Sequence, residues 1–189
     1  AEIDDAWTAS YVWNITHKNI TDDIDVVVYT AAVHADNPEF IAAKEHQIPM
    51  LTRAELLGQL MTNYKTPIAV SGTHGKTTTT SMLSYILIDA DTDPTISVGG
   101  ILDSIGGNIR VGKSEYFVTE ACEYTNSYHA FKPFISIILN VDADHLDFFK
   151  DIDEIAESFH VFATKTPKEG LVIVNGDMKY YDTVVRDLE

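Results

Sequence analysis

The sequence predicts an α/β fold made of two domains that meet near residue 65. Short runs of β-branched residues alternate with segments of helical periodicity. This alternation starts again after a turn-rich stretch at residues 63–67, which we interpret as a linker. A glycine-containing loop at residues 72–75 then connects a strand to a helix.

The composition excludes several classes of protein. Hydrophobic residues make up 45% of the 189 residues and charged residues 22%, which is typical of a globular protein. The net charge of −16 argues against nucleic acid as a partner, although it leaves nucleotides open. The single cysteine, Cys122, excludes an internal disulfide and favours a cytoplasmic protein. No apolar run reaches the roughly 18 residues of a membrane span.

The first domain follows a βαβα pattern. The β-branched run at 24–30 predicts a strand buried on both faces, and Pro38 begins a helix that extends to Glu45. A second strand is expected at 48–51. Thr52 and Glu55 have the spacing of a capping box, so another helix follows. This is half of a doubly wound, Rossmann-like unit.

The second domain begins with a strand at 68–71, followed by the loop and a helix from Thr77 to Leu87. Glycine pairs at 99–100 and 106–107 predict turns. Apolar runs and one amphipathic segment predict the remaining elements, which are strands at 116–119, 135–139 and 171–174 and a helix at 152–163.

The loop has the features of a phosphate-binding loop. Gly72 and Gly75 allow the backbone to turn tightly and bring its N–H groups close to phosphate oxygens. Lys76 adds a positive charge, and the Thr77 hydroxyl suits Mg²⁺. The helix that follows contributes the positive end of its dipole.

One feature departs from the standard loop, which has a glycine five residues before Gly75, where this chain has Val70. The alternative is an ordinary strand-to-helix turn with a solvated lysine. The four threonines 77–80 favour phosphate binding, because they form helices poorly and a bound anion would offset this.

Three segments together resemble the Mur ligase family. They are Gly-Thr-His-Gly-Lys-Thr-Thr-Thr-Thr at 72–80, Glu-Ala-Cys-Glu-Tyr at 120–124 and Asn-Val-Asp-Ala-Asp-His-Leu-Asp at 140–147. The resemblance extends from about residue 24 to residue 177. The family has a shortened loop, which explains Val70, and the histidine within the loop is similar to that of the alanine-adding member.

The resemblance implies a partial UDP-sugar-binding, Rossmann-like domain at 1–64 and part of a P-loop-type central ATP-binding domain at 65–189. The glycine-rich UDP loop and the C-terminal domain of the family are not found in the sequence. We therefore expect a fragment that is inactive alone.

The implied reaction is ATP-dependent ligation of L-alanine to UDP-N-acetylmuramate through an acyl phosphate, in peptidoglycan synthesis. The catalytic residues would be Lys76, Glu120 and His145, and the Mg²⁺ ligands Thr77, Glu120 and His145. The residues implied to bind ATP are those of the loop and the start of the helix, namely Gly72, Thr73, His74, Gly75, Lys76, Thr77 and Thr78.

Several alternatives stay open at this point. Glu123 is either the acidic residue that acts, or a solvated or supporting carboxylate, and Asp144 has a possible direct role. Cys122 is expected to be a small buried residue. The functional alternatives are a murein peptide ligase, which shares Glu123 and Tyr124, a non-catalytic ATP-binding module, and a P-loop phosphotransferase.

Overall fold

The computed structural model describes residues 15–30 and 32–188. The chain forms two compact units, divided between Leu56 and Leu57 inside helix α2 (Arg53–Met61), and each is described by itself. The assignment of a UDP-sugar domain to 1–64 and an ATP-binding domain to 65–189 stays a prediction.

The first unit has the predicted βαβα order. Strands β1 (Val27–Tyr29) and β2 (Met50–Thr52) pair in parallel, with α1 (Pro38–Glu45) between them in sequence. The Thr52 hydroxyl accepts the Glu55 amide at 3.1 Å, and the Glu55 carboxylate accepts the Thr52 amide at 2.7 Å. The predicted capping box is therefore confirmed.

The expectation that the first strand is buried on both faces is wrong. Val26 and Val28 are 45% and 42% exposed. The physical reason is the size of the sheet, because β1 pairs with β2 alone within the described residues. A two-stranded sheet has too little surface above and below it to bury both sides of a strand.

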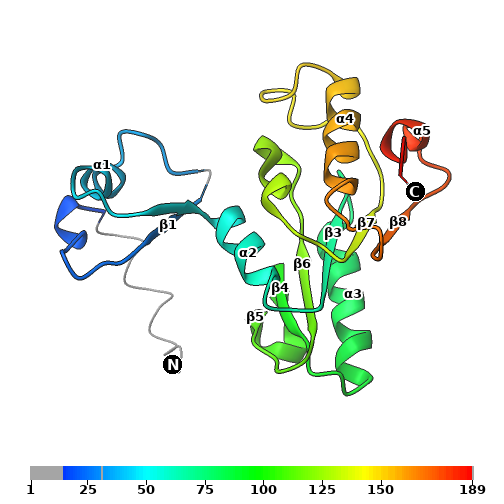
Figure 1. Ribbon diagram of the computed structural model, residues 1–189, viewed down its shortest axis with the longest axis horizontal. Coiled ribbons are helices and arrows are strands. Elements are labelled where there is room, and N and C mark those ends of the chain that lie inside the picture. The colour runs from blue at the N-terminus through cyan, green and yellow to red at the C-terminus, as the bar shows by residue number, and fades with distance from the viewer. Residues whose placement is uncertain (1–14, 31, 189) are drawn as a thin grey trace. The chain divides into compact units, whose positions relative to one another are not determined.

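The second unit is built on a six-stranded sheet in the order β5-β4-β6-β3-β7-β8, parallel except for β5 (Figure 1). Strand β3 lies between β6 and β7, and its residues from Pro67 to Ser71 are buried. The strands are β3 (Thr66–Ser71), β4 (Thr95–Leu102), β5 (Gly107–Arg110), β6 (Tyr116–Glu120), β7 (Ile135–Ile138) and β8 (Leu171–Val174). This mixed α/β architecture confirms the predicted fold class.

The helices of this unit are α3 (Lys76–Asp89), α4 (Ile152–Ala163) and α5 (Tyr181–Val184), together with the 3₁₀ segments η3 (Asp103–Ile105) and η4 (Tyr124–Ala130). Another 3₁₀ turn, η2 (His17–Asn19), belongs to the first unit. Helix α4 packs an aromatic face on η4, where the ring of Tyr128 stacks on Phe162 at 4.7 Å and meets the edge of Phe159.

Two local predictions in this unit are wrong. Gly99 and Gly100 lie inside β4 rather than in a turn, because β4 continues beyond its pairing with β6 at residues 95–97 and pairs with β5 again at Leu102. A side chain at Gly99 would come within 3.0 Å of the Glu120 carboxylate, so the glycine leaves room for it. Thr66 and Pro67, expected in the linker, already belong to β3.

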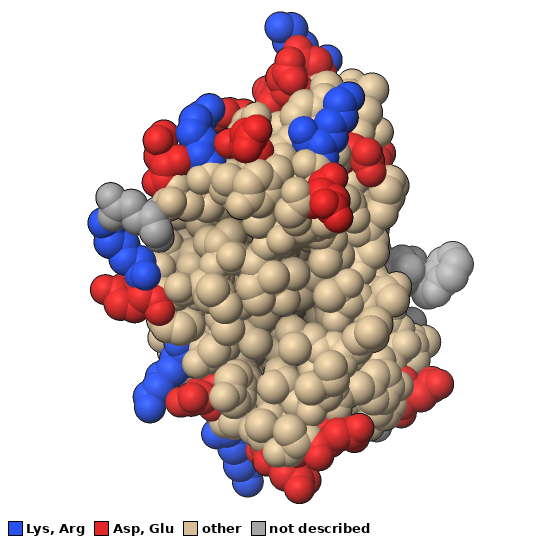
Figure 2. All heavy atoms as spheres, turned by 90° about the vertical axis from the view of Figure 1, so that its right-hand side faces the viewer, with Lys and Arg blue, Asp and Glu red and all other residues tan. Residues whose placement is uncertain are grey.

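The charged side chains are distributed unevenly over the surface. Figure 2 shows a broad face on which Lys, Arg, Asp and Glu gather along the rim and leave the middle uncharged. Among the described residues, no helix combines the length and apolar character required to cross a bilayer.

Candidate nucleotide-binding site

The loop between β3 and α3 lies at the carboxyl edge of the parallel strands, where open α/β sheets bind ligands. Gly72 has a φ of 141° and packs so closely on the segment after β7 that a Cβ would lie 3.0 Å from the Cβ of Leu139. Gly75 has a φ of 85° and precedes α3 without a side-chain cap. The first amides of α3 therefore point to a place that an anion can occupy.

The segment after β7 holds the loop in shape. Asn140 accepts the His74 amide at 2.8 Å and donates to the His74 carbonyl at 2.9 Å. The Thr73 hydroxyl accepts the Asp142 amide at 2.9 Å. These bonds use the side chains of Asn140 and Thr73 to fix the loop backbone before a ligand arrives. Both loop amides thus have acceptors within the protein. The His74 amide donates to the Asn140 side chain, and the Thr73 amide donates to the Asn140 carbonyl.

Lys76 is held by the loop and by a carboxylate from the turn between β6 and η4. Its Nζ donates to the carbonyls of Gly72 at 2.6 Å and Thr73 at 3.2 Å. It also lies 3.1 and 3.0 Å from the two carboxylate oxygens of Glu123. Glu123 is only 1% exposed, which excludes the alternative of a solvated carboxylate and leaves a supporting or a direct role.

Glu120, the last residue of β6, reaches the start of α3 from the next strand. Its carboxylate accepts the Thr77 hydroxyl at 3.1 Å and the Gly99 amide at 2.6 Å. A carboxylate and a hydroxyl side by side are oxygen ligands of the kind that Mg²⁺ takes. Of the three predicted ligands, the fold thus brings Thr77 and Glu120 together.

His145, the third predicted ligand, has a strained backbone with a φ of 51°. Its amide donates to the Asp144 carboxylate at 2.7 Å, and its ring packs on Tyr124 with centroids 4.7 Å apart. The Tyr124 hydroxyl donates to Asp147 at 3.0 Å, and this hydrogen bond raises the pKa of Tyr124.

The described residues show no hydrogen bond or ion pair between His145 and Glu120. His145 instead approaches Glu123, with 3.9 Å between Nε2 and the nearer carboxylate oxygen. Among these residues there is also no ready-made group of three acidic, histidine or cysteine ligands for a metal. The role of His145 as a metal ligand stays a prediction.

Two residues near the site differ from expectation. Cys122 is exposed, so its expected role as a small buried residue is wrong. It lies between Ala121 and Glu123, which are buried, and therefore takes the outward position in this turn. Asn140, which holds the loop at His74, has no role assigned to it from the sequence. Its position directly after a strand of the same sheet edge was the available signal.

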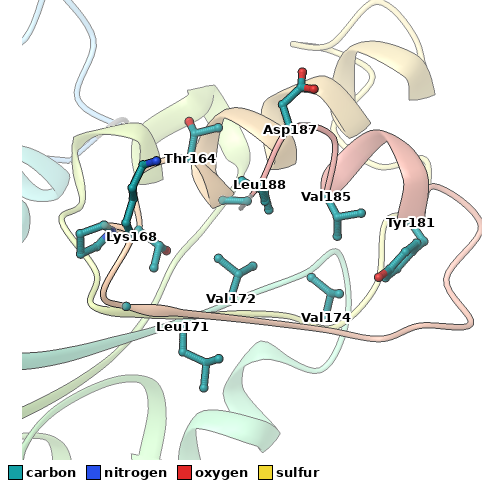
Figure 3. A pocket seen from close by; sticks show the side chains of 13 residues that line it. Thr164, Lys168, Leu171, Val172, Val174, Tyr181, Val185, Asp187 and Leu188 are labelled. Atoms are coloured by element: carbon teal, nitrogen blue, oxygen red, sulfur yellow. The ribbon is translucent and has the colours of Figure 1, made fainter.

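A cavity of 660 Å³ lies elsewhere in this unit, between β8, the end of α4 and α5. Figure 3 shows Val172 and Val174 pointing into it and Leu171 pointing away. No residue of the 72–78 loop lines it. The cavity is thus separate from the phosphate loop, and its lining combines apolar residues of β8 with the charged residues Lys168 and Asp187.

Comparison with known proteins agrees with the site. Residues 70–189 match the model of the Mur ligase middle domain, and residues 10–65 match that of the Mur ligase family catalytic domain. The chain belongs to the Mur ligase family.

Its relatives include the UDP-N-acetylmuramate–L-alanine ligases of Lachnospira eligens and Agathobacter rectalis. The first is 65% identical over 171 residues, which is 90% of this chain and 37% of the relative. The second is 65% identical over 177 residues, which is 94% of this chain and 39% of the relative. The chain therefore spans less than half the length of these curated relatives.

Two solved structures share the fold. The UDP-N-acetylmuramate–alanine ligase of Thermotoga maritima has a TM-score of 0.80 at 30% identity, over 91% of this chain and 40% of that one. A Neisseria ligase that joins UDP-N-acetylmuramate to L-alanyl-γ-D-glutamyl-meso-diaminopimelate has a TM-score of 0.82 at 26% identity, over 90% of this chain and 58% of that one.

Proposed function

We propose that the protein containing this chain ligates L-alanine to UDP-N-acetylmuramate with ATP, in cytoplasmic peptidoglycan synthesis. The names of relatives at 65% identity support this activity. In this reaction the muramyl carboxylate receives a phosphoryl group from ATP, and the amine of L-alanine then displaces phosphate from the acyl phosphate. The part of the reaction assigned to this chain is the binding of ATP.

The observation that carries the proposal is the position of Lys76 at an uncapped helix start. Its ammonium lies among the loop carbonyls of Gly72 and Thr73, beside first-turn amides that have no capping side chain. Phosphoryl transfer depends largely on positioning and on neutralising charge around the phosphates. A fixed lysine and open amides supply both functions.

Mg²⁺ fits the oxygens of Thr77 and Glu120, which already lie 3.1 Å apart. When bound, the ion would neutralise charge on the phosphate oxygens. His145 is proposed as its further ligand. A crystal soaked with Mn²⁺ and a non-hydrolysable ATP analogue tests this set, because anomalous density should lie between Glu120 and His145. A His145 ring that stays turned away from the ion would refute its place in the set.

Nucleotide binding by the chain itself is testable by calorimetry. We expect weak binding of Mg·ATP and Mg·ADP to wild type and none to Lys76→Ala. Lys113→Ala is the matched control, since it removes an exposed lysine far from the loop. Thr77→Ala should weaken binding only when Mg²⁺ is present. Equal binding by wild type and Lys76→Ala, both folded by circular dichroism, would contradict the phosphate-loop assignment.

A murein peptide ligase is the second candidate. The Neisseria structure supports it, because its TM-score of 0.82 is as high as that of the alanine ligase. The full-length protein should be assayed with UDP-N-acetylmuramate, Mg·ATP and either L-alanine or the tripeptide L-alanyl-γ-D-glutamyl-meso-diaminopimelate. Phosphate release with L-alanine alone would support the first proposal, and release with the tripeptide alone the second.

A further inference from the structure

Glu123 is a buried carboxylate whose charge is balanced at the phosphate loop. Its side chain is only 2% exposed, and that of Lys76 is 17% exposed. Both carboxylate oxygens lie within hydrogen-bonding distance of the Lys76 ammonium, at 3.0 and 3.1 Å. A carboxylate removed from water in this way depends on a cation beside it. The proposed function uses Lys76 and gives Glu123 no role.

The bonding of Lys76 identifies the partner that a phosphate would replace. An ammonium group has three N–H donors, and the carbonyls of Gly72 and Thr73 together with Glu123 occupy them. The two carbonyls belong to a loop that Asn140 and Asp142 hold in place. The side chain of Glu123 is the one acceptor of the three that is not part of the loop backbone.

Replacing Glu123 by a phosphate as the partner of Lys76 is costly without a further cation, because of the negative charges around the loop. Glu120 and Glu123 both face the beginning of α3. Lys76 is the ammonium that contacts Glu123 at 3.0 Å, and the His145 ring lies further away, at 3.9 Å. A triphosphate adds about four negative charges beside these two carboxylates. A divalent cation offsets much of the resulting repulsion, which is strong because buried charges are poorly screened.

We propose that Glu123 is a positioning residue that keeps Lys76 paired in the empty loop and thereby makes triphosphate binding depend on Mg²⁺. This inference rests on the proposed function, because it assumes that the loop binds phosphates. It assigns opposite effects to two neighbouring carboxylates. Glu120 favours binding through the metal, whereas Glu123 restrains binding in the absence of the metal.

The decisive variant is Glu123→Gln, which keeps the size and one carbonyl acceptor but removes the charge. The affinity for ATP in EDTA should rise at least about tenfold, because the ammonium is then free to pair with phosphate. The affinity for Mg·ATP should change less than about threefold, because the metal already offsets the carboxylate. Inorganic tripolyphosphate in EDTA should show the same gain, since the effect concerns phosphates and not the adenine.

Three further variants separate this role from a structural one. Glu123→Asp keeps the charge and should bind metal-free ATP as weakly as wild type. Glu169→Gln removes the same charge from an exposed turn before β8, and should change neither affinity. In a Lys76→Met background, Glu123→Gln should give no gain, because no ammonium remains to be released.

Titration calorimetry of the chain with ATP, with and without Mg²⁺, measures these affinities, and circular dichroism verifies folding. The proposal is overturned if Glu123→Gln binds metal-free ATP no more tightly than wild type while both bind Mg·ATP. An equal gain in the Lys76→Met background would also overturn it, because Glu123 would then repel phosphate directly. If folded wild type binds neither ATP nor Mg·ATP, the proposed function fails as well. Binding of Mg·ATP by wild type therefore distinguishes a failure of the Glu123 proposal from a failure of the proposed function.

Discussion

Helices α3 and α4 belong to the same unit and begin in opposite ways. Helix α4 begins at a side-chain cap, since Asp151 accepts the Glu154 amide at 3.0 Å. Glu154 in turn accepts the Lys150 amide at 2.7 Å. Helix α3 begins at Gly75, which is left-handed and offers no side chain to its first amides. A bound anion would therefore do for α3 what the Asp151 side chain does for α4, which is to accept hydrogen bonds from the first amides of the helix.

The two helices also differ in what they bury. The buried face of α4 consists of Ile155, Ala156, Ser158, Phe159, Phe162 and Ala163. In α3, by contrast, only Thr80 and Ser84 are buried, while Met82 and Ile86 are 60% and 62% exposed. Helix α4 is therefore held by packing, whereas the beginning of α3 is held by the loop and by the Lys76–Glu123 pair.

The largest effect should come from the packed face of α4. Phe159→Ala is expected to lower the free energy of unfolding by about 3–5 kcal/mol, because it leaves a cavity beside the ring of Tyr128. Met82→Ala on α3 should cost less than about 1 kcal/mol, since that side chain is already in water. Urea unfolding followed by circular dichroism measures both. Similar losses for the two variants would show that the helices are held alike.

The second largest effect should come from the charged pair at the start of α3. Lys76→Met is expected to cost about 3 kcal/mol, because it leaves the buried Glu123 carboxylate without its cation. Adding Glu123→Gln should recover more than half of this loss. The measurement is urea unfolding of the two single variants, the double variant and wild type without nucleotide. A double variant as unstable as Lys76→Met would contradict the dependence on charge.

The contrast between these helices explains how much could be predicted from the sequence. Helix α4 was predicted at 152–163, because its period, its cap and its packing all specify the same structure. The loop at 72–75 was also predicted to connect a strand to a helix, since its glycines and its flanking pattern are local signals. The elements with agreeing local signals were thus predicted from the sequence.

Predictions failed where a distant segment decides the structure. Gly99 is a turn signal locally, but the renewed pairing of β4 with β5 at Leu102 and the hydrogen bond from the Gly99 amide to Glu120 place it in a strand. Glu120 was predicted over Glu123 as the acting carboxylate from the spacing of the motif. This spacing contains no information on which of the two carboxylates contacts Lys76. The fold decides that contact, because the turn after β6 carries Glu123 and β6 lies beside β3, the strand that leads into the loop of Lys76.

The third effect concerns the cap of α4. Asp151→Ala is expected to cost about 1 kcal/mol, because the Glu154 amide loses its acceptor. Asp153→Ala is the matched control, since it removes the same charge from an exposed position in the first turn. It should cost less than about 0.5 kcal/mol. Equal losses from the two changes would mean that the charge, and not the hydrogen bond, stabilises the helix start.

The smallest effect is a pH dependence at the contact between α4 and His129. The ring Nε2 lies 3.0 Å from the Ser158 carbonyl oxygen, which is an acceptor, so Nε2 is the nitrogen that donates there. Desolvation lowers the pKa of His129 below its ordinary value of 6.5. The unfolded chain therefore binds a proton more readily than the folded chain, and stability is lost as the pH falls below about 6.5.

The variant His129→Gln should reduce this loss, because it removes the titrating ring and keeps a donor for Ser158. The effect should be small, since the ring is only half-buried. The difference in free energy of unfolding between pH 8 and pH 5, measured in urea, should be smaller in the variant than in wild type. An unchanged difference would show that other groups cause the acid sensitivity.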